Sequence, residues 1–128
     1  MKLGYTILYV DDVAATLTQW EQAFGLTRRF LHESGIYGEM ETGDTTLSFA
    51  EREFGRAHFT DDETRAMFDS HPRLFEIGLV TDDVQAAWEV AIRAGVRGLV
   101  APKVQPWGQT VCWLRESNGI LVELASPM

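Results

Sequence analysis

The chain has 128 residues, 45% of them hydrophobic, which is enough for one compact domain with a proper core and too few for two ordinary domains. Its 19 acidic and 11 basic residues give a formal net charge of −8, which disfavours nucleic acids and anionic membranes as partners because both are bound through basic patches. The same charge accommodates a neutral or cationic small ligand, although solubility alone also accounts for it.

The sequence also limits the compartment and the redox chemistry. No apolar run approaches the roughly 18 residues of a membrane-spanning helix. Met1 to Gly4 leads into a predicted strand without a signal-peptide pattern, so we expect a cytoplasmic protein. Cys112 is the only cysteine, which excludes an internal disulfide, and its apolar surroundings favour a buried structural thiol over a nucleophile.

The first predicted elements are a strand from Gly4 to Val10 and a helix from about Val13 to Phe24. The preceding Asp11 and Asp12 suit a helix N-cap, and Gly25 suits the end of the helix. Apolar residues recur along this helix every three or four positions and form a stripe that must pack on a sheet: Val13, Leu17, Trp20 and Phe24.

Three strand candidates follow, separated by glycine-containing turns: Arg28–His32, Ile36–Glu41 and Thr45–Ala50. This half of the chain therefore has the order βαβββ. Its middle strand carries Glu39 and Glu41 on one face, which is typical of a solvated surface.

The stretch from Glu51 to Pro72 has a different composition, in which charges alternate with single aromatic residues and no period is sustained. Thr60 to Glu63 is a capping box that opens at most a short helix. His58 and His71 lie in this connector, where a lone histidine is more often a surface residue than a ligand.

The second half repeats the order of elements, with a strand, a helix and three strands at Leu74–Thr81, about Val84–Ala94, Gly98–Val104, Thr110–Arg115 and Ile120–Ala125. Ser117 to Gly119 predicts a hairpin turn. Trp107 lies in a loop between a proline and a glycine. It fits the rim of a pocket or an interface, although a single exposed tryptophan can also be incidental.

The two halves match when Asp82 is aligned with Asp11, 71 positions earlier, since Val84 then meets Val13 and Ala94 meets Ala23. A strand, aspartate turn and helix can recur by chance, but the later elements match as well, so we infer an internal repeat. We predict a single α+β domain over residues 1–128, built from modules of about 1–50 and 73–128 joined by the connector 51–72.

This organisation resembles the vicinal oxygen chelate superfamily, which holds glyoxalase I, extradiol dioxygenases, fosfomycin-resistance enzymes and bleomycin-binding proteins. The resemblance covers nearly the whole chain and rests on the Asp-Asp-Val turn of the opening strand and on the stretches AFGL, FEIGLVTDDV and NGILVEL. It implies tandem βαβββ modules in a curled, cup-shaped mixed sheet with helices outside, and a homodimer. The scaffold carries both metal enzymes and metal-free binders.

The resemblance places the superfamily's four metal-ligand positions at Tyr5, Ser48, Glu76 and Glu123, all facing into the cup. Both histidines of the glyoxalase pattern are absent. The remaining donors suit neither zinc nor nickel nor a two-histidine iron site, so we expect no cofactor. Magnesium or manganese could use Glu76 and Glu123 only with help from substrate oxygens.

Three functions stay open. The first is a metal-free binder of the bleomycin-resistance type that sequesters an antibiotic or another aromatic or cationic ligand. The second is a glyoxalase-like lyase, isomerase or dioxygenase-like enzyme with Glu123 or Glu76 as general base. The third is an inactive dimeric scaffold. The missing histidines favour the first, for which the candidate ligand-binding residues are Tyr5, Ser48, Glu76, Trp107, Trp113 and Glu123.

Overall fold

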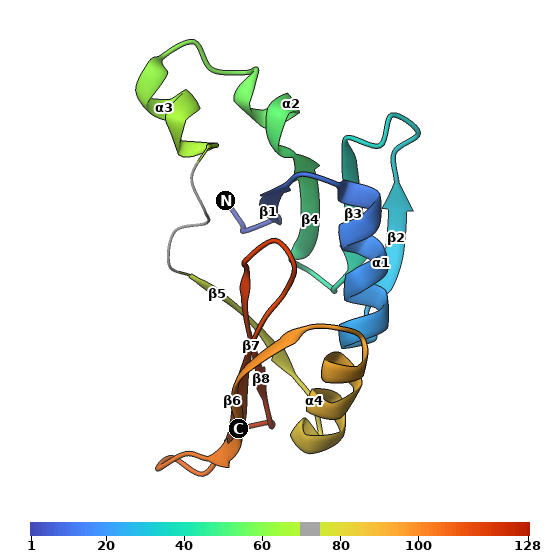
Figure 1. Cartoon of the computed structure of the whole chain (residues 1–128), viewed down its shortest axis with the longest axis vertical. Coiled ribbons are helices and arrows are strands. Elements are labelled where there is room, and N and C mark those ends of the chain that lie inside the picture. Colours follow the sequence, from blue (N-terminus) through green and yellow to red (C-terminus); the bar gives the residue numbers. More distant parts are fainter. Residues whose placement is uncertain (70–74) are drawn as a thin grey trace. The chain divides into compact units, whose positions relative to one another are not determined.

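The computed structural model describes residues 1–69 and 75–128, and its helices and strands follow the predicted order closely (Figure 1). The first sheet contains β1 (Tyr5–Val10), β2 (Thr27–Leu31), β3 (Tyr37–Glu41) and β4 (Thr46–Glu51), with α1 (Val13–Phe24) between β1 and β2. The second contains β5 (Glu76–Val80), β6 (Arg97–Val104), β7 (Thr110–Arg115) and β8 (Leu121–Ala125), with α4 (Val84–Arg93) between β5 and β6. The α+β class with tandem βαβββ modules is confirmed.

The connector holds two short helices among its described residues, α2 (Arg52–Arg56) and α3 (Asp62–Met67). The predicted short helix is α3, and its N-cap is Asp61, whose side chain accepts a hydrogen bond from the backbone N–H of Thr64 at 2.8 Å. The helix α2 was not predicted. His71 and Leu74, at which the second module's first strand was predicted to begin, lie outside the described residues.

The two sheets have the same strand order, β1-β4-β3-β2 and β5-β8-β7-β6. In each, the first strand pairs in parallel with the last, and the remaining pairs are antiparallel. The described chain divides into two compact units, the first built on β1–β4 and the second on β5–β8.

The N-termini of α1 and α4 are capped by the same hydrogen bond. Asp12 accepts a hydrogen bond from the backbone N–H of Ala15 at 2.9 Å, and Asp83 accepts one from Ala86 at 2.9 Å. In both helices the carboxylate satisfies a backbone donor that has no partner within the helix. Gly25, with φ of +65°, ends α1, as predicted.

One face of each sheet packs on the unit's long helix. In the first unit the fully buried Trp20 of α1 meets Phe49 of β4, with ring centroids 5.3 Å apart. In the second, Gly98 of β6 lies so close to Trp88 of α4 that a β-carbon at this position would collide with the indole ring. The opposite face of each sheet is not covered by this long helix, and we call it the open face. Within the described residues, no helix is long and apolar enough to span a membrane.

Candidate functional site

In the second unit the strand register brings two of the predicted site residues onto one face. Glu123 of β8 lies opposite Gly78 of β5 on one side and opposite Trp113 of β7 on the other. Because side chains alternate along a strand, Glu76, two residues before Gly78, points to the same side as Glu123.

This face is the one turned away from α4. Gly98, which meets Trp88 of α4, is paired with Leu114, so Leu114 points towards the helix and the adjacent Trp113 points away from it. Glu76, Trp113 and Glu123 thus form one cluster on the open face of the second sheet, and we call it the carboxylate cluster.

The two carboxylates of the cluster have different surroundings. The indole N–H of Trp113 donates to Oε2 of Glu76 at 3.1 Å. Glu123 lies on an inner strand and is only partly exposed, whereas Glu76 lies on an edge strand and is exposed. Burial raises the pKa of Glu123, and the charge of Glu76 and a hydrogen bond with Glu76 raise it further.

The carboxylate cluster is not paired with any basic side chain of the described residues. Among residues 1–69 and 75–128, no lysine or arginine forms an ion pair with Glu76 or Glu123. The guanidinium of Arg115, on the same face of β7, donates to the backbone oxygen of Gly119 at 3.0 Å. The cluster thus concentrates negative charge beside an aromatic ring, which suits a cationic group.

Trp107 lies apart from the carboxylate cluster along the sheet. It is 62% exposed in the turn between β6 and β7, where its indole N–H donates to Oε1 of Gln109 at 2.8 Å. Val80, at the C-terminal end of β5, pairs with Ala125. The next residue, Ser126, accepts a hydrogen bond from the backbone N–H of Thr110 at the start of β7. The turn before Thr110 therefore lies at the Val80 end of the sheet. Glu76 is at the other end of β5.

The remaining predicted residues, Tyr5 and Ser48, lie together on the open face of the first sheet. Ser48 pairs with Ile7, so Tyr5, two residues before Ile7, shares its face. Tyr5 is 58% exposed, whereas Ser48 is fully buried and its hydroxyl donates to the backbone oxygen of Thr6 at 3.3 Å.

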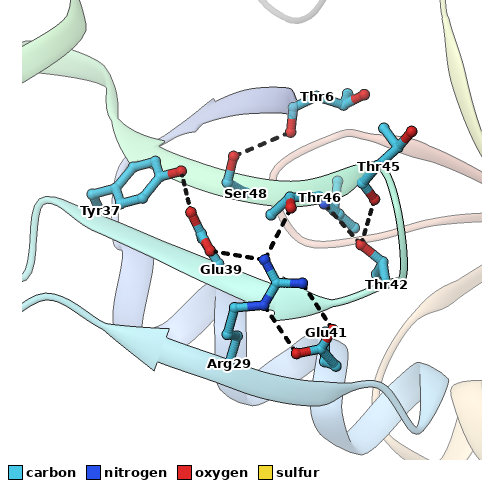
Figure 2. A network of polar contacts seen from close by, with 10 residues as sticks. Thr6, Arg29, Tyr37, Glu39, Glu41, Thr42, Thr45, Thr46 and Ser48 are labelled. Carbon is cyan, nitrogen blue, oxygen red and sulfur yellow. Dashed lines mark hydrogen bonds and ion pairs between the residues drawn. The ribbon is translucent and has the colours of Figure 1, made fainter. Parts of the chain in front are cut away.

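The sequence interpretation missed a polar network on this face, shown in Figure 2. The hydroxyl of Tyr37 donates to Oε1 of Glu39 at 2.8 Å, and Nη1 of Arg29 donates to Oε2 of Glu39 at 3.2 Å and to Thr46 Oγ1 at 3.0 Å. The prediction that Glu39 lies on a solvated surface was wrong, since Glu39 is only 8% exposed. Hydrogen bonds from Tyr37 of the same strand and from Arg29 of the neighbouring β2 compensate its burial.

Arg29 also binds Glu41, with two hydrogen bonds of 2.9 and 2.8 Å that form a bidentate pair. These hydrogen bonds raise the pKa of Arg29 and lower the pKa of Glu41. Burial raises the pKa of Tyr37, the nearby hydroxyl of Ser48 opposes this rise, and Glu39 adds to it. Arg29 and Glu41 are therefore both charged at neutral pH.

One part of this network could have been predicted from the sequence. Strand alternation already placed Tyr37, Glu39 and Glu41 on one face of β3. The sequence did not reveal that a register irregularity in β2, between Arg28 and Phe30, directs Arg29 towards the same carboxylates.

The donors on the two open faces do not fit a transition metal. In the part of the chain that the structure describes, no three His, Cys, Asp or Glu side chains lie close enough to hold an ion. Near Glu76 and Glu123 the third group is the indole N–H of Trp113, which donates and has no lone pair to offer. In the first unit the hydroxyl of Ser48 is bound to a backbone oxygen.

Comparisons with known proteins agree on one group. Residues 2–124 match the model of the glyoxalase/bleomycin resistance protein/dioxygenase superfamily. No curated protein matches the chain.

Several solved structures share the fold. A glyoxalase/bleomycin resistance protein/dioxygenase family enzyme from Burkholderia phytofirmans is 20% identical, with a TM-score of 0.82 and 100% of both chains covered. A glyoxalase-related enzyme from Fulvimarina pelagi is 14% identical, with a TM-score of 0.81 over 99% of this chain and 88% of that one. TioX from Micromonospora is 14% identical, with a TM-score of 0.73 over 100% of both chains. At these identities the likeness shows the fold alone.

Proposed function

The chain belongs to the glyoxalase/bleomycin resistance protein/dioxygenase superfamily, and on this premise we propose that it is a metal-free binding protein for a small basic aromatic molecule. One observation carries the proposal. The carboxylate cluster holds two acids and an aromatic ring on one open sheet face, and no basic side chain of the described chain pairs with either acid.

The chemistry of the carboxylate cluster supports a cationic ligand. Burial raises the pKa of Glu123, and the charge of the nearby Glu76 raises it further because two carboxylates repel each other. A protonated amine between them would remove this repulsion and form charge-assisted hydrogen bonds. The ring of Trp113 would add stacking or a cation–π contact. Sequestration of a basic aromatic antibiotic is one use of such a site.

A second candidate function is an enzyme in which Glu123 acts as general base. The raised pKa of Glu123 favours it, because a general base works best when its pKa lies near the working pH. The two candidates differ in what they do to a bound compound: a binding protein returns the ligand unchanged, whereas a lyase or isomerase converts it. Mass spectrometry of ligands after prolonged incubation separates them.

Binding is tested with proflavine, a cationic aromatic dye whose fluorescence reports its environment. Glu123→Gln should weaken binding by about ten- to a hundredfold, since hydrogen bonds to charged groups contribute about 1.5–3 kcal/mol. The matched control is Glu89→Gln, which makes the same change on the exposed surface of α4. Equal affinity of both variants, or no binding by the wild type, contradicts the proposal.

Gly78→Val provides an independent test that changes no charge. A β-carbon at Gly78 meets no atom within 4 Å, so the substitution is accommodated. The new side chain would lie on the open face beside both carboxylates, because Gly78 is paired with Glu123 and is two residues from Glu76 on β5. It should block proflavine while leaving Tm within about 2 °C of the wild type.

A further inference from the structure

The open face of the first sheet carries a hydrogen-bonding group that the proposed function does not use. Gly38 approaches Val13 and Leu17 of α1, so the alternate residues Tyr37, Glu39 and Glu41 point to the face away from the helix. Figure 2 shows that Arg29 reaches both carboxylates from β2.

Packing does not explain this network. The core of the first unit lies on the other side of the sheet, where Trp20, Met40 and Phe49 are fully buried. A buried ion pair is often no more stable than apolar residues of the same volume. Glu39 is a carboxylate only 8% exposed, held by Tyr37 of its own strand and by Arg29 of β2, and this arrangement calls for a role besides stability.

A count of donors and acceptors shows what the network offers. The hydroxyl proton of Tyr37 is directed to Glu39, and Arg29 directs its donors to Glu39, Glu41 and Thr46. A phenol oxygen has two lone pairs, so the oxygen of Tyr37 keeps acceptor capacity even with the hydroxyl of Ser48 beside it. Tyr37 is part exposed and therefore presents an acceptor.

The net charge of the network and the aromatic rings beside it indicate which class of ligand it would bind. One arginine and two glutamates leave the network with a net charge of about −1, which favours a cationic donor over an anion. Phe30, 40% exposed, lies with its ring centroid 5.9 Å from that of Tyr37 and offers an apolar surface beside the acceptor.

The repeat relates this network to the carboxylate cluster. Glu39 lies opposite Ser48 on neighbouring antiparallel strands, as Trp113 lies opposite Glu123. Ser48 in turn lies opposite Ile7, as Glu123 lies opposite Gly78. The position that carries Trp113 in the second unit thus carries Glu39 in the first.

We propose that Tyr37 and Glu39 form a second ligand-contacting pair, in which the Tyr37 oxygen accepts a hydrogen bond from an N–H group of a basic aromatic ligand and Glu39 fixes the phenol's orientation. Arg29 is a positioning residue that holds Glu39 in place. The ligand class rests on the proposed function, whereas the residues and the unit are new.

Two dyes of similar ring system and equal charge test the proposal. Proflavine has exocyclic N–H donors, and acridine orange carries methyl groups in their place. Tyr37→Phe should lower the affinity for proflavine by about three- to tenfold, the value of one ordinary hydrogen bond, and leave that for acridine orange unchanged. Thr18→Val, which removes a hydroxyl from the exposed surface of α1 on the other side of the sheet, should alter neither affinity.

The positioning role of Arg29 has its own readout. Arg29→Lys keeps the charge but not the fork that bridges Glu39 and Glu41, so the ratio of proflavine to acridine orange affinity should fall by about three- to tenfold. A purely structural role would lower both affinities together. Should Arg29→Lys fail to fold, Glu39→Gln tests the same ratio.

The outcomes separate the two proposals. If Tyr37→Phe binds proflavine like the wild type while Glu123→Gln does not, the second pair is contradicted and the carboxylate cluster stands. If Tyr37→Phe weakens proflavine binding and Glu123→Gln does not, the second pair stands and the carboxylate cluster is contradicted. If neither variant changes binding, or the wild type does not bind, both proposals fail.

Discussion

Trp113 donates its indole N–H to the carboxylate of Glu76 at 3.1 Å, although the two residues are 37 positions apart in the sequence. They belong to β7 and β5, which are separated by β8, the strand of Glu123. The hydrogen bond thus reaches over the position of Glu123 and joins the three side chains into one cluster. Burial raises the pKa of Glu123 above its ordinary value, and the neighbouring Glu76 raises it further.

The pH dependence of stability should reveal this raised pKa. A carboxyl group whose folded-state pKa lies above its ordinary value of 4.5 contributes stability that is fully present below that value and lost as pH rises through the raised pKa. Glu123→Gln removes this loss, so its Tm should exceed that of the wild type by a few degrees at pH 7 and match it near pH 4, since about 1 kcal/mol corresponds to roughly 4 °C.

Thermal unfolding between pH 4 and pH 8 checks the result, with Glu89→Gln as the control that should show no such pH dependence. A Tm difference between Glu123→Gln and the wild type that is the same at pH 4 and pH 7 would show that Glu123 ionises as in the unfolded chain.

Replacement by alanine should lower stability at one glycine and leave it nearly unchanged at another. A β-carbon at Gly38 would lie 2.6 Å from Cδ1 of Leu17 and 3.2 Å from the backbone oxygen of Phe30, so Gly38→Ala overpacks the contact between β3 and α1. We expect a loss of about 1–3 kcal/mol in the free energy of unfolding. Gly78→Ala meets open space and should change stability by less than about 0.5 kcal/mol. Urea denaturation measures both, and equal losses would contradict the packing.

Much of the fold could be predicted from local patterns. Paired aspartates before an apolar stripe marked the starts of α1 and α4, and Asp12 and Asp83 are their N-caps. The glycine-containing hairpin at Ser117 to Gly119 connects β7 to β8. These features depend on residues within a few positions of one another, so a single sequence reveals them.

The site could be predicted only in part, because its contacts join distant strands. Alternation together with the family pattern indicated that Glu76 and Glu123 face the same way, and within the second unit they do. The network around Glu39 was missed because its arginine comes from β2, where a register irregularity sets the direction of the side chain. Without that arginine, a glutamate two residues from a tyrosine on a strand is typical of a solvent-exposed surface.

Metal content provides a further prediction. The purified protein should carry no stoichiometric zinc, nickel or iron, and chelator should leave Tm within about 1 °C, because removal of a ligand that binds only the native state would lower it. Elemental analysis together with thermal unfolding checks this. About one metal ion per chain would overturn the metal-free proposal.

We also expect a homodimer in solution. Large apolar side chains of the second unit are exposed, with Val80 at 71%, Val104 at 65% and Trp107 at 62%. Burial of such side chains between two copies is a common source of dimer stability. Sedimentation velocity at micromolar concentration should show a dimer, and Val104→Asp should shift the equilibrium towards monomer. A wild-type monomer would contradict the expectation.

The most direct test of the central claim is the NMR signal of the Trp113 indole N–H during a titration with proflavine. This proton contacts Glu76 and would contact any cation held by Glu76 and Glu123. We predict that it shifts progressively with the dye while the signal of the fully buried Trp20 stays in place. In Glu123→Gln the shift should need about ten- to a hundredfold more dye. Added salt, which screens exposed charges, should reduce the shift in the wild type. Saturable proflavine binding without any change at Trp113 would show that the ligand binds elsewhere.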